Sequence, residues 1–71
     1  MTTLRDWEAL ALITQTILQA RRIQHPTLGA IARVVAECAP LLRIEDKEEE
    51  AIIEDDAIFE LCHRYGIQRD R

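Results

Sequence analysis

The stretch PTLGAIARVVAECAP, residues 26–40, decides the fold of this chain of 71 residues. Two prolines bound it, and its only charged side chains are Arg33 and Glu37, which at i, i+4 share one side of a helix. Proline suits the first turn of a helix and disrupts a helix further along. The stretch therefore predicts a helix over residues 26–39 that is apolar over most of its circumference and lies at the centre of the molecule.

Another helix is predicted upstream of this central segment. Over residues 3–24, apolar side chains recur at threes and fours, and arginines and glutamines gather on the opposite side. The helix has to end there, because the residue before Pro26 is pushed out of the helical region of backbone space. Either His25 or Thr27 is then the expected cap of the central helix.

The third helix is predicted over residues 46–65. Asp46 and Glu49 have the spacing of a capping box, in which each side chain binds the backbone N–H of the other residue. At the other end, Gly66 suits the left-handed residue of a Schellman ending. We expect the helix to bend or break near Glu54, because this charged residue falls inside the apolar stripe.

Together these segments predict an all-α fold: a small three-helix bundle, folded up-down-up, in a single domain over residues 1–71. A chain of this length builds only a thin core, and its first two helices carry more apolar surface than three helices hide. We therefore expect a homodimer, or an obligate complex with a partner, to complete the bundle. The dimer seam is expected at Trp7, Leu10, Ile13, Ile17, Ile31 and Val35.

Charge is unevenly distributed along the chain. The net charge is −4, but residues 45–56 alone hold eight acids against one lysine, a local charge of −7. The rest of the chain carries eight arginines and five acids, a sum of +3. We interpret the acidic segment as a contact surface for a protein partner with a basic surface, which would steer association and weaken with salt. The expected contact residues are Glu45, Asp46, Glu48, Glu49, Glu50, Glu54, Asp55 and Asp56.

A second interpretation of the acidic segment stays open. A solvated acidic face keeps a small, apolar protein soluble, and acids favour the positive N-terminal end of a helix dipole. The acids nevertheless occupy every available position in the first turn and a half of the third helix, which exceeds what capping needs. Sequence alone leaves both interpretations standing.

The sequence lacks the signatures of catalysis and of metal binding. Cys38 and Cys62 stand far apart without a C-x-x-C motif, so two buried thiols are expected rather than a disulfide or a zinc site. Carboxylates at i, i+3 and i, i+4 have a spacing that suits a divalent cation, but one helix does not form a cage. The chain has no serine, no glycine-rich phosphate loop and no nucleophile beside a base. We expect no enzyme, no metal and no cofactor.

These observations favour a small non-enzymatic interaction protein that uses the acidic segment and an adjacent apolar patch. An inhibitor, anti-activator or adaptor of a larger complex, a type frequent among phage- and plasmid-encoded proteins, fits this description. The alternative is a small transcriptional regulator that contacts nucleic acid through Arg21, Arg22 and Arg33, although the acidic segment repels phosphates and argues against direct binding. With no run of about 18 apolar residues and no signal peptide, we expect no membrane association and a cytoplasmic location.

Overall fold

The computed structural model describes residues 5–68, which form three α-helices and one short 3₁₀ helix. In chain order these are α1 (Asp6–Ala20), α2 (Leu28–Cys38), the 3₁₀ helix η1 (Ala39–Leu42) and α3 (Lys47–Arg64). No strand occurs between residues 5 and 68, and the three α-helices pack together, which confirms the predicted all-α class. Residues 3 and 4, where the first helix was predicted to begin, lie outside the described residues.

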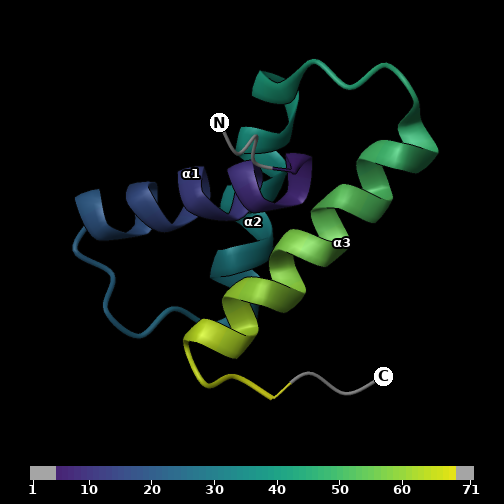
Figure 1. Cartoon of the computed structure of the whole chain (residues 1–71). Coiled ribbons are helices and arrows are strands. Elements are labelled where there is room, and N and C mark those ends of the chain that lie inside the picture. Colours follow the sequence, from purple (N-terminus) through teal and green to yellow (C-terminus); the bar gives the residue numbers. More distant parts are fainter. Residues whose placement is uncertain (1–4, 69–71) are drawn as a thin grey trace.

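The three helices cross one another instead of lying side by side along one axis. In Figure 1, α1 and α3 run in broadly the same direction across the molecule, and α2 crosses both of them steeply. Each pair of α-helices is in contact, and the molecule measures 31 × 29 × 23 Å along its principal axes. The three helices are thus present as predicted. An up-down-up bundle would have α2 run antiparallel along its neighbours, whereas here α2 crosses them.

The core lies where the three helices meet. Its buried apolar residues are Leu10, Ala11 and Leu18 of α1, Ile31, Val34, Val35 and Cys38 of α2, Ala39 of η1, and Ile53, Ala57, Leu61 and Cys62 of α3. Half-buried apolar side chains, among them Trp7 and Tyr65, pack against this cluster. Since each of the three α-helices contributes several of the buried residues, the fold depends on all three crossings.

Local sequence explains where α2 and α3 begin. Thr27, one of the two predicted caps, accepts a hydrogen bond from the Ala30 N–H at 3.1 Å. Asp46 caps α3 and accepts from the N–H groups of Glu48 at 2.9 Å and of Glu49 at 3.5 Å. The return bond of a capping box, from the Glu49 carboxylate to the Asp46 N–H, is not formed among the described residues, so half of the predicted motif is present.

α3 ends at the predicted glycine. Gly66 has a left-handed backbone with φ 67°, and its N–H donates to the His63 carbonyl at 3.3 Å. The N–H of Ile67 folds back and donates to the Cys62 carbonyl at 2.8 Å, which completes a Schellman motif. Glycine is needed here because a left-handed backbone crowds the Cβ of other residues.

α1 ends earlier than predicted, through a second Schellman motif. The Ile23 N–H donates to the Leu18 carbonyl at 2.9 Å, and the Arg22 N–H donates to the Gln19 carbonyl at 3.0 Å. Arg22 has a left-handed backbone with φ 61°, which costs free energy in any residue that carries a Cβ. The sequence does not reveal this ending, because no glycine marks it.

α3 is one unbroken helix, so the break predicted near Glu54 does not occur. Glu54 is half-buried at the edge of the side that packs on the core. A long side chain in such a position lays its methylene groups on apolar neighbours and keeps its carboxylate in water. An acid inside the apolar stripe is therefore compatible with a continuous helix.

Candidate protein-binding site

α3 carries an exposed stripe on the side that faces away from the core. Ile52 and Phe59 lie two turns apart on it and are 62% and 53% exposed. The acids three and four positions from Ile52 lie on the same side of the helix. We call this stripe the outer face of α3, and it consists of Glu48, Glu49, Ile52, Asp55, Asp56 and Phe59.

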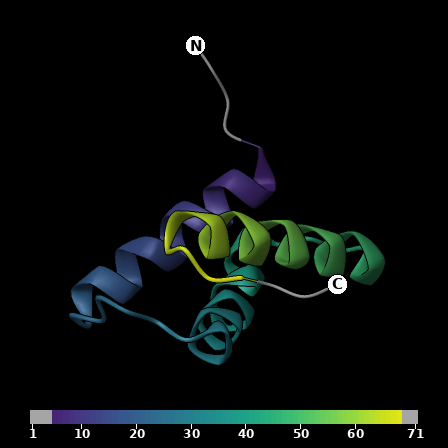
Figure 2. The same cartoon turned by 90° about the horizontal axis from the view of Figure 1, so that it is seen from below.

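The outer face projects into solvent. Figures 1 and 2 both show the first turns of α3 extending beyond α1 and α2. Glu48, Glu49 and Asp56 are exposed, and Asp55 is half-buried. Single exposed apolar residues are ordinary on protein surfaces, but here two large ones share a helical stripe and are flanked by acids. Such a surface complements a partner that offers apolar and basic groups together.

The eight predicted contact acids do not share one surface. Glu45, Asp46, Glu48, Glu49 and Asp56 are exposed, whereas Glu50, Glu54 and Asp55 are half-buried. Glu50 and Glu54 lie on the opposite side of α3 from Ile52, and the Glu50 carboxylate pairs with the Lys47 ammonium at 3.9 Å. Asp46 uses its carboxylate to cap the helix. The structure therefore brings together only the four acids of the outer face.

A cavity of about 350 Å³ opens beside the outer face. It is lined by Trp7 of α1 and by Asp56, Phe59 and Glu60 of α3. Trp7 is half-buried and packs against the core, so one wall of the cavity is anchored in the fold. Glu60 accepts a hydrogen bond from the Nε of Arg64 at 3.1 Å. The cavity, called here the aromatic cavity, thus combines two aromatic rings with two carboxylates.

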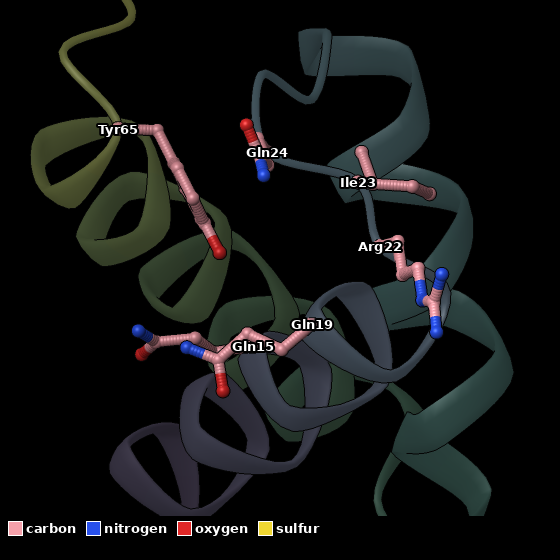
Figure 3. Close-up of a pocket in the computed structure, with 6 residues that line it drawn as sticks. All are labelled: Gln15, Gln19, Arg22, Ile23, Gln24 and Tyr65. Atoms are coloured by element: carbon pink, nitrogen blue, oxygen red, sulfur yellow. The ribbon is translucent and has the colours of Figure 1, made fainter.

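A more polar cavity of about 440 Å³ lies between α1 and the end of α3 (Figure 3). Its lining residues are Gln15, Gln19, Arg22, Ile23, Gln24 and Tyr65. In Figure 3, the Tyr65 side chain reaches from the end of α3 toward the glutamines of α1. The Gln15 side-chain oxygen accepts a hydrogen bond from an Arg64 guanidinium nitrogen at 2.6 Å. The amides, the phenol and the guanidinium of this cavity offer hydrogen-bond donors and acceptors.

The six residues of the predicted dimer seam differ in their burial within one chain. Leu10, Ile31 and Val35 are fully buried inside a single chain. The other predicted seam residues, Trp7, Ile13 and Ile17, are half-buried and pack against the same core. Of the six predicted seam residues, Trp7, Ile13 and Ile17 are therefore the ones that still offer surface to a second copy, and the dimer itself stays a prediction.

Both cysteines are buried and free, as predicted. Burial raises the pKa of the Cys38 thiol above its ordinary value, and the adjacent Thr14 hydroxyl opposes this effect in part. Thr14 is itself fully buried, and its Oγ1 lacks a hydrogen-bond partner of good geometry. The thiolate is the nucleophilic form of cysteine, and burial disfavours it. Cys38 therefore serves as a packing residue of the core and not as a nucleophile.

Two of the remaining candidates for chemistry, Cys62 and His63, line one small cavity of about 100 Å³ together with Phe59 and Ile67. His63 follows Cys62 in sequence, but His63 is exposed while the Cys62 thiol is buried. Between residues 5 and 68, no group of three or more His, Cys, Asp and Glu side chains is placed to hold a metal ion. Over the same range, none of the helices combines the length and the hydrophobicity of a membrane span.

Sequence reasoning missed the aromatic cavity. Trp7 and Phe59 belong to the first and third helices, and only the packing of α1 on α3 brings them together. The one available signal was the scarcity of aromatic residues, since the chain has a single Trp, a single Tyr and a single Phe. All three line cavities in the structure.

No protein family, no curated protein and no solved structure matches this chain. The functional interpretation is therefore carried by the outer face of α3 and by the aromatic cavity beside it.

Proposed function

We propose that this protein is a small non-enzymatic interaction module, an inhibitor, anti-activator or adaptor, that docks the outer face of α3 on a basic surface of a larger protein complex. The placement of Ile52 and Phe59, both more than half exposed, among acids is the observation that supports this most. Burial of apolar side chains supplies affinity, about 25 cal/mol for each Å² removed from water. The carboxylates select a basic partner and accelerate its approach.

The two components of this surface respond differently to salt. At physiological ionic strength, charges act over about 8 Å, so the acids of the outer face steer a partner mainly at short range. Added salt should slow association, because screening removes this steering. The apolar contacts of Ile52 and Phe59 are not screened and should leave residual binding. A partner that is retained weakly at high salt fits this surface better than one that is lost completely.

The described side chains support binding rather than catalysis. The thiol of Cys38 is in the core, and the Cys62 thiol, which lines a small cavity together with the exposed His63, is itself almost fully buried. The polar cavity is lined by three glutamines, an arginine, an isoleucine and a tyrosine, which offer hydrogen bonds but include no Ser, Cys, His, Asp or Glu. The exposed chemistry of the molecule is thus charge and apolar surface.

Charge reversal tests the electrostatic component. The tagged full-length chain is used to capture partners from a native extract treated with nuclease, at low and moderate salt, with mass spectrometry as the readout. We expect one dominant protein partner that elutes with salt, and capture that falls severalfold for Glu49→Lys. Glu37→Lys is the control for reversing an exposed acid away from the outer face: it also breaks the ion pair of Glu37 with Arg21 at 3.5 Å, at the end of α1, and capture should still be unchanged. Equal capture by the wild type and Glu49→Lys would contradict the proposal.

Truncation of an apolar side chain tests the other component. Ile52→Ala and Leu41→Ala form a matched pair, since Ile52 is 62% exposed on the outer face and Leu41 is 67% exposed in η1. Burying the rest of an isoleucine in an interface is worth about 1 kcal/mol, so Ile52→Ala should weaken capture about fivefold. Leu41→Ala should leave capture unchanged. Equal losses for both variants would show that the outer face is not the docking surface.

The same capture experiment addresses the nucleic-acid alternative. Recovery that disappears with nuclease would favour a regulator that acts through Arg21, Arg22 and Arg33. Two features make this the weaker proposal: Arg21 pairs with the Glu37 carboxylate at 3.5 Å, and Arg22 lines the polar cavity. Arg33 is exposed on α2.

Self-association remains a prediction, and fewer of the expected seam residues are accessible to support it. Three of the six expected seam residues are half-buried, and α1 also exposes Leu12, which is 51% accessible. A mass measured by light scattering at several concentrations tests it. A stable, fully helical monomer at micromolar concentration would contradict the dimer and would leave the proposed heterologous partner unaffected.

A further inference from the structure

The aromatic cavity has a chemistry that singles out one kind of side chain. We propose that it receives an arginine side chain, which the basic partner inserts against the rings of Trp7 and Phe59 and the carboxylates of Asp56 and Glu60. This inference rests on the proposed function for the source of the arginine. The recognition chemistry rests on the cavity alone, so the arginine site and the proposed function can fail separately.

The aromatic walls favour a cation over an anion. The face of an aromatic ring carries negative charge density, and tryptophan attracts cations most strongly among the aromatic side chains. Trp7 packs against the core, so it offers a ring that is held in place before a ligand arrives. Phe59 is 53% exposed, and a ligand in the cavity would cover part of its ring. Preformed sites of this kind lose less conformational entropy on binding.

The carboxylates favour a ligand with several N–H donors. Asp56 is exposed and makes no hydrogen bond or ion pair within the described chain, so its carboxylate is available. Glu60 already accepts from Arg64 through Oε1 at 3.1 Å, which leaves its second oxygen for a ligand. Guanidinium carries five N–H donors in a plane, binds carboxylates through two bonds at once and stacks on aromatic rings.

The alternatives for this cavity are less suitable. An apolar side chain would cover the two carboxylates without offering them a hydrogen bond, which carries a desolvation cost. An anionic side chain would be repelled by Asp56, by Glu60 and by the rest of the acidic outer face. Lysine has the right charge, but its compact ammonium is strongly hydrated and does not stack. The volume of about 350 Å³ lies at the small end of ligand pockets, as expected for a single side chain.

Amide NMR on the full-length chain tests the inference with defined probes. The chain has one tryptophan, so its single indole N–H signal reports on the cavity directly. The probes are acetylated and amidated Gly-Gly-Arg-Gly-Gly, the same peptide with lysine, and the same peptide with citrulline, the uncharged analogue of arginine. We expect the arginine peptide to shift the Trp7 indole signal with a Kd of about 1 mM. The lysine peptide should bind about threefold more weakly, and the citrulline peptide at least about tenfold more weakly.

Variants locate the binding. Phe59→Leu removes a ring at an exposed position and should weaken the arginine peptide about fivefold. Asp56→Asn should weaken it about fivefold as well, because a charge-assisted bond becomes a neutral one. Glu45→Gln is the control for charge: Glu45 is exposed just before α3 and lies outside both the outer face and the cavity, so it should change binding less than twofold.

The outcomes separate this inference from the proposed function. Equal shifts with arginine and citrulline peptides, or equal losses for Asp56→Asn and Glu45→Gln, would overturn the arginine site even if the partner is still captured through the outer face. Shifts of the Trp7 indole on raising protein concentration alone would overturn it too, because the occupant would then be a second copy of this chain. Specific arginine binding would support the site even if Glu49→Lys and Ile52→Ala left partner capture unchanged.

Discussion

Replacing the buried Thr14 by valine should stabilise this protein. Thr14 is 0% exposed on α1, and its Oγ1 has no hydrogen-bond partner of good geometry within the described chain. A buried hydroxyl that loses water without gaining a partner lowers the stability of the folded state by about 1–3 kcal/mol. Valine has the same branched shape and nearly the same helix propensity, so the substitution removes this cost without opening a cavity.

The expected gain is in the lower part of that range. The Cys38 thiol beside the hydroxyl is a weak acceptor and offsets some of the cost, which leaves about 1–2 kcal/mol to be recovered. In a domain of this size, each kcal/mol moves Tm by about 4–8 °C. Thermal unfolding followed by far-UV circular dichroism should therefore show a rise of roughly 4–15 °C for Thr14→Val, and urea unfolding should show a higher midpoint at an unchanged slope.

Thr16→Val is the matched control. Thr16 lies two positions along the same helix, but it is exposed, and its hydroxyl donates to the Leu12 carbonyl at 2.8 Å. Water replaces such a bond when it is lost, so the free energy of unfolding should change by less than about 0.5 kcal/mol. The two variants share the residue types and the helix, and they differ in burial and in hydrogen bonding.

An unchanged or lower midpoint for Thr14→Val, with Thr16→Val neutral, would refute this reasoning. It would mean that the Thr14 hydroxyl forms a hydrogen bond with the Cys38 sulfur that is worth more than its desolvation. A double-mutant cycle with Cys38→Ala measures that bond directly: a coupling near zero supports an unsatisfied hydroxyl, and a coupling near about 1 kcal/mol supports a bond.

Other expected outcomes follow from helix ends and from the buried thiol. Arg22→Gly should raise the free energy of unfolding by up to about 1 kcal/mol, because glycine adopts a left-handed backbone without strain. Gly66→Ala should lower it by a similar amount, because alanine adds a Cβ to a left-handed backbone. Urea midpoints measure both changes. Asp46→Ala should cost about 1 kcal/mol, since two N–H groups at the start of α3 lose their acceptor, and Asp46→Asn should restore most of it. The raised pKa of Cys38 means that the folded state keeps the thiol proton to higher pH than the unfolded state does. Stability should therefore fall as pH rises above about 8.5, and Cys38→Ala should reduce that slope.

The helices could be predicted because the signals that form them are local. Thr27, Asp46 and Gly66 each make hydrogen bonds within four positions along the chain, so their roles follow from residue type and spacing. The end of α1 has no such signal, since Arg22 is not a residue type that marks a left-handed backbone. The steep crossing of α2 is not local either, because it depends on how three apolar surfaces fit together.

The candidate site likewise has a part that local sequence predicts and a part that depends on how the helices pack. Charge density located the acidic segment, and helical spacing decides which acids share a face with Ile52. Which of these faces stays in solvent depends on how α3 packs on the core, and that packing leaves Glu50 and Glu54 half-buried, apart from the outer face. The meeting of Trp7 with Phe59 required the packing of α1 on α3, which no local pattern encodes.

Departures from the best-folding sequence point to the part of this molecule that serves a partner. For stability alone, valine at position 14 and glycine at position 22 would be better, and nothing in the structure explains the residues found there. Ile52 and Phe59 depart in another way: a small domain with a thin core leaves two of its larger apolar side chains in water. Unlike the first two, they lie together on one stripe, among acids and beside a cavity with an anchored tryptophan. A single unfavourable residue needs no functional explanation. Several exposed apolar side chains on one surface are different, because binding a partner would remove them from water.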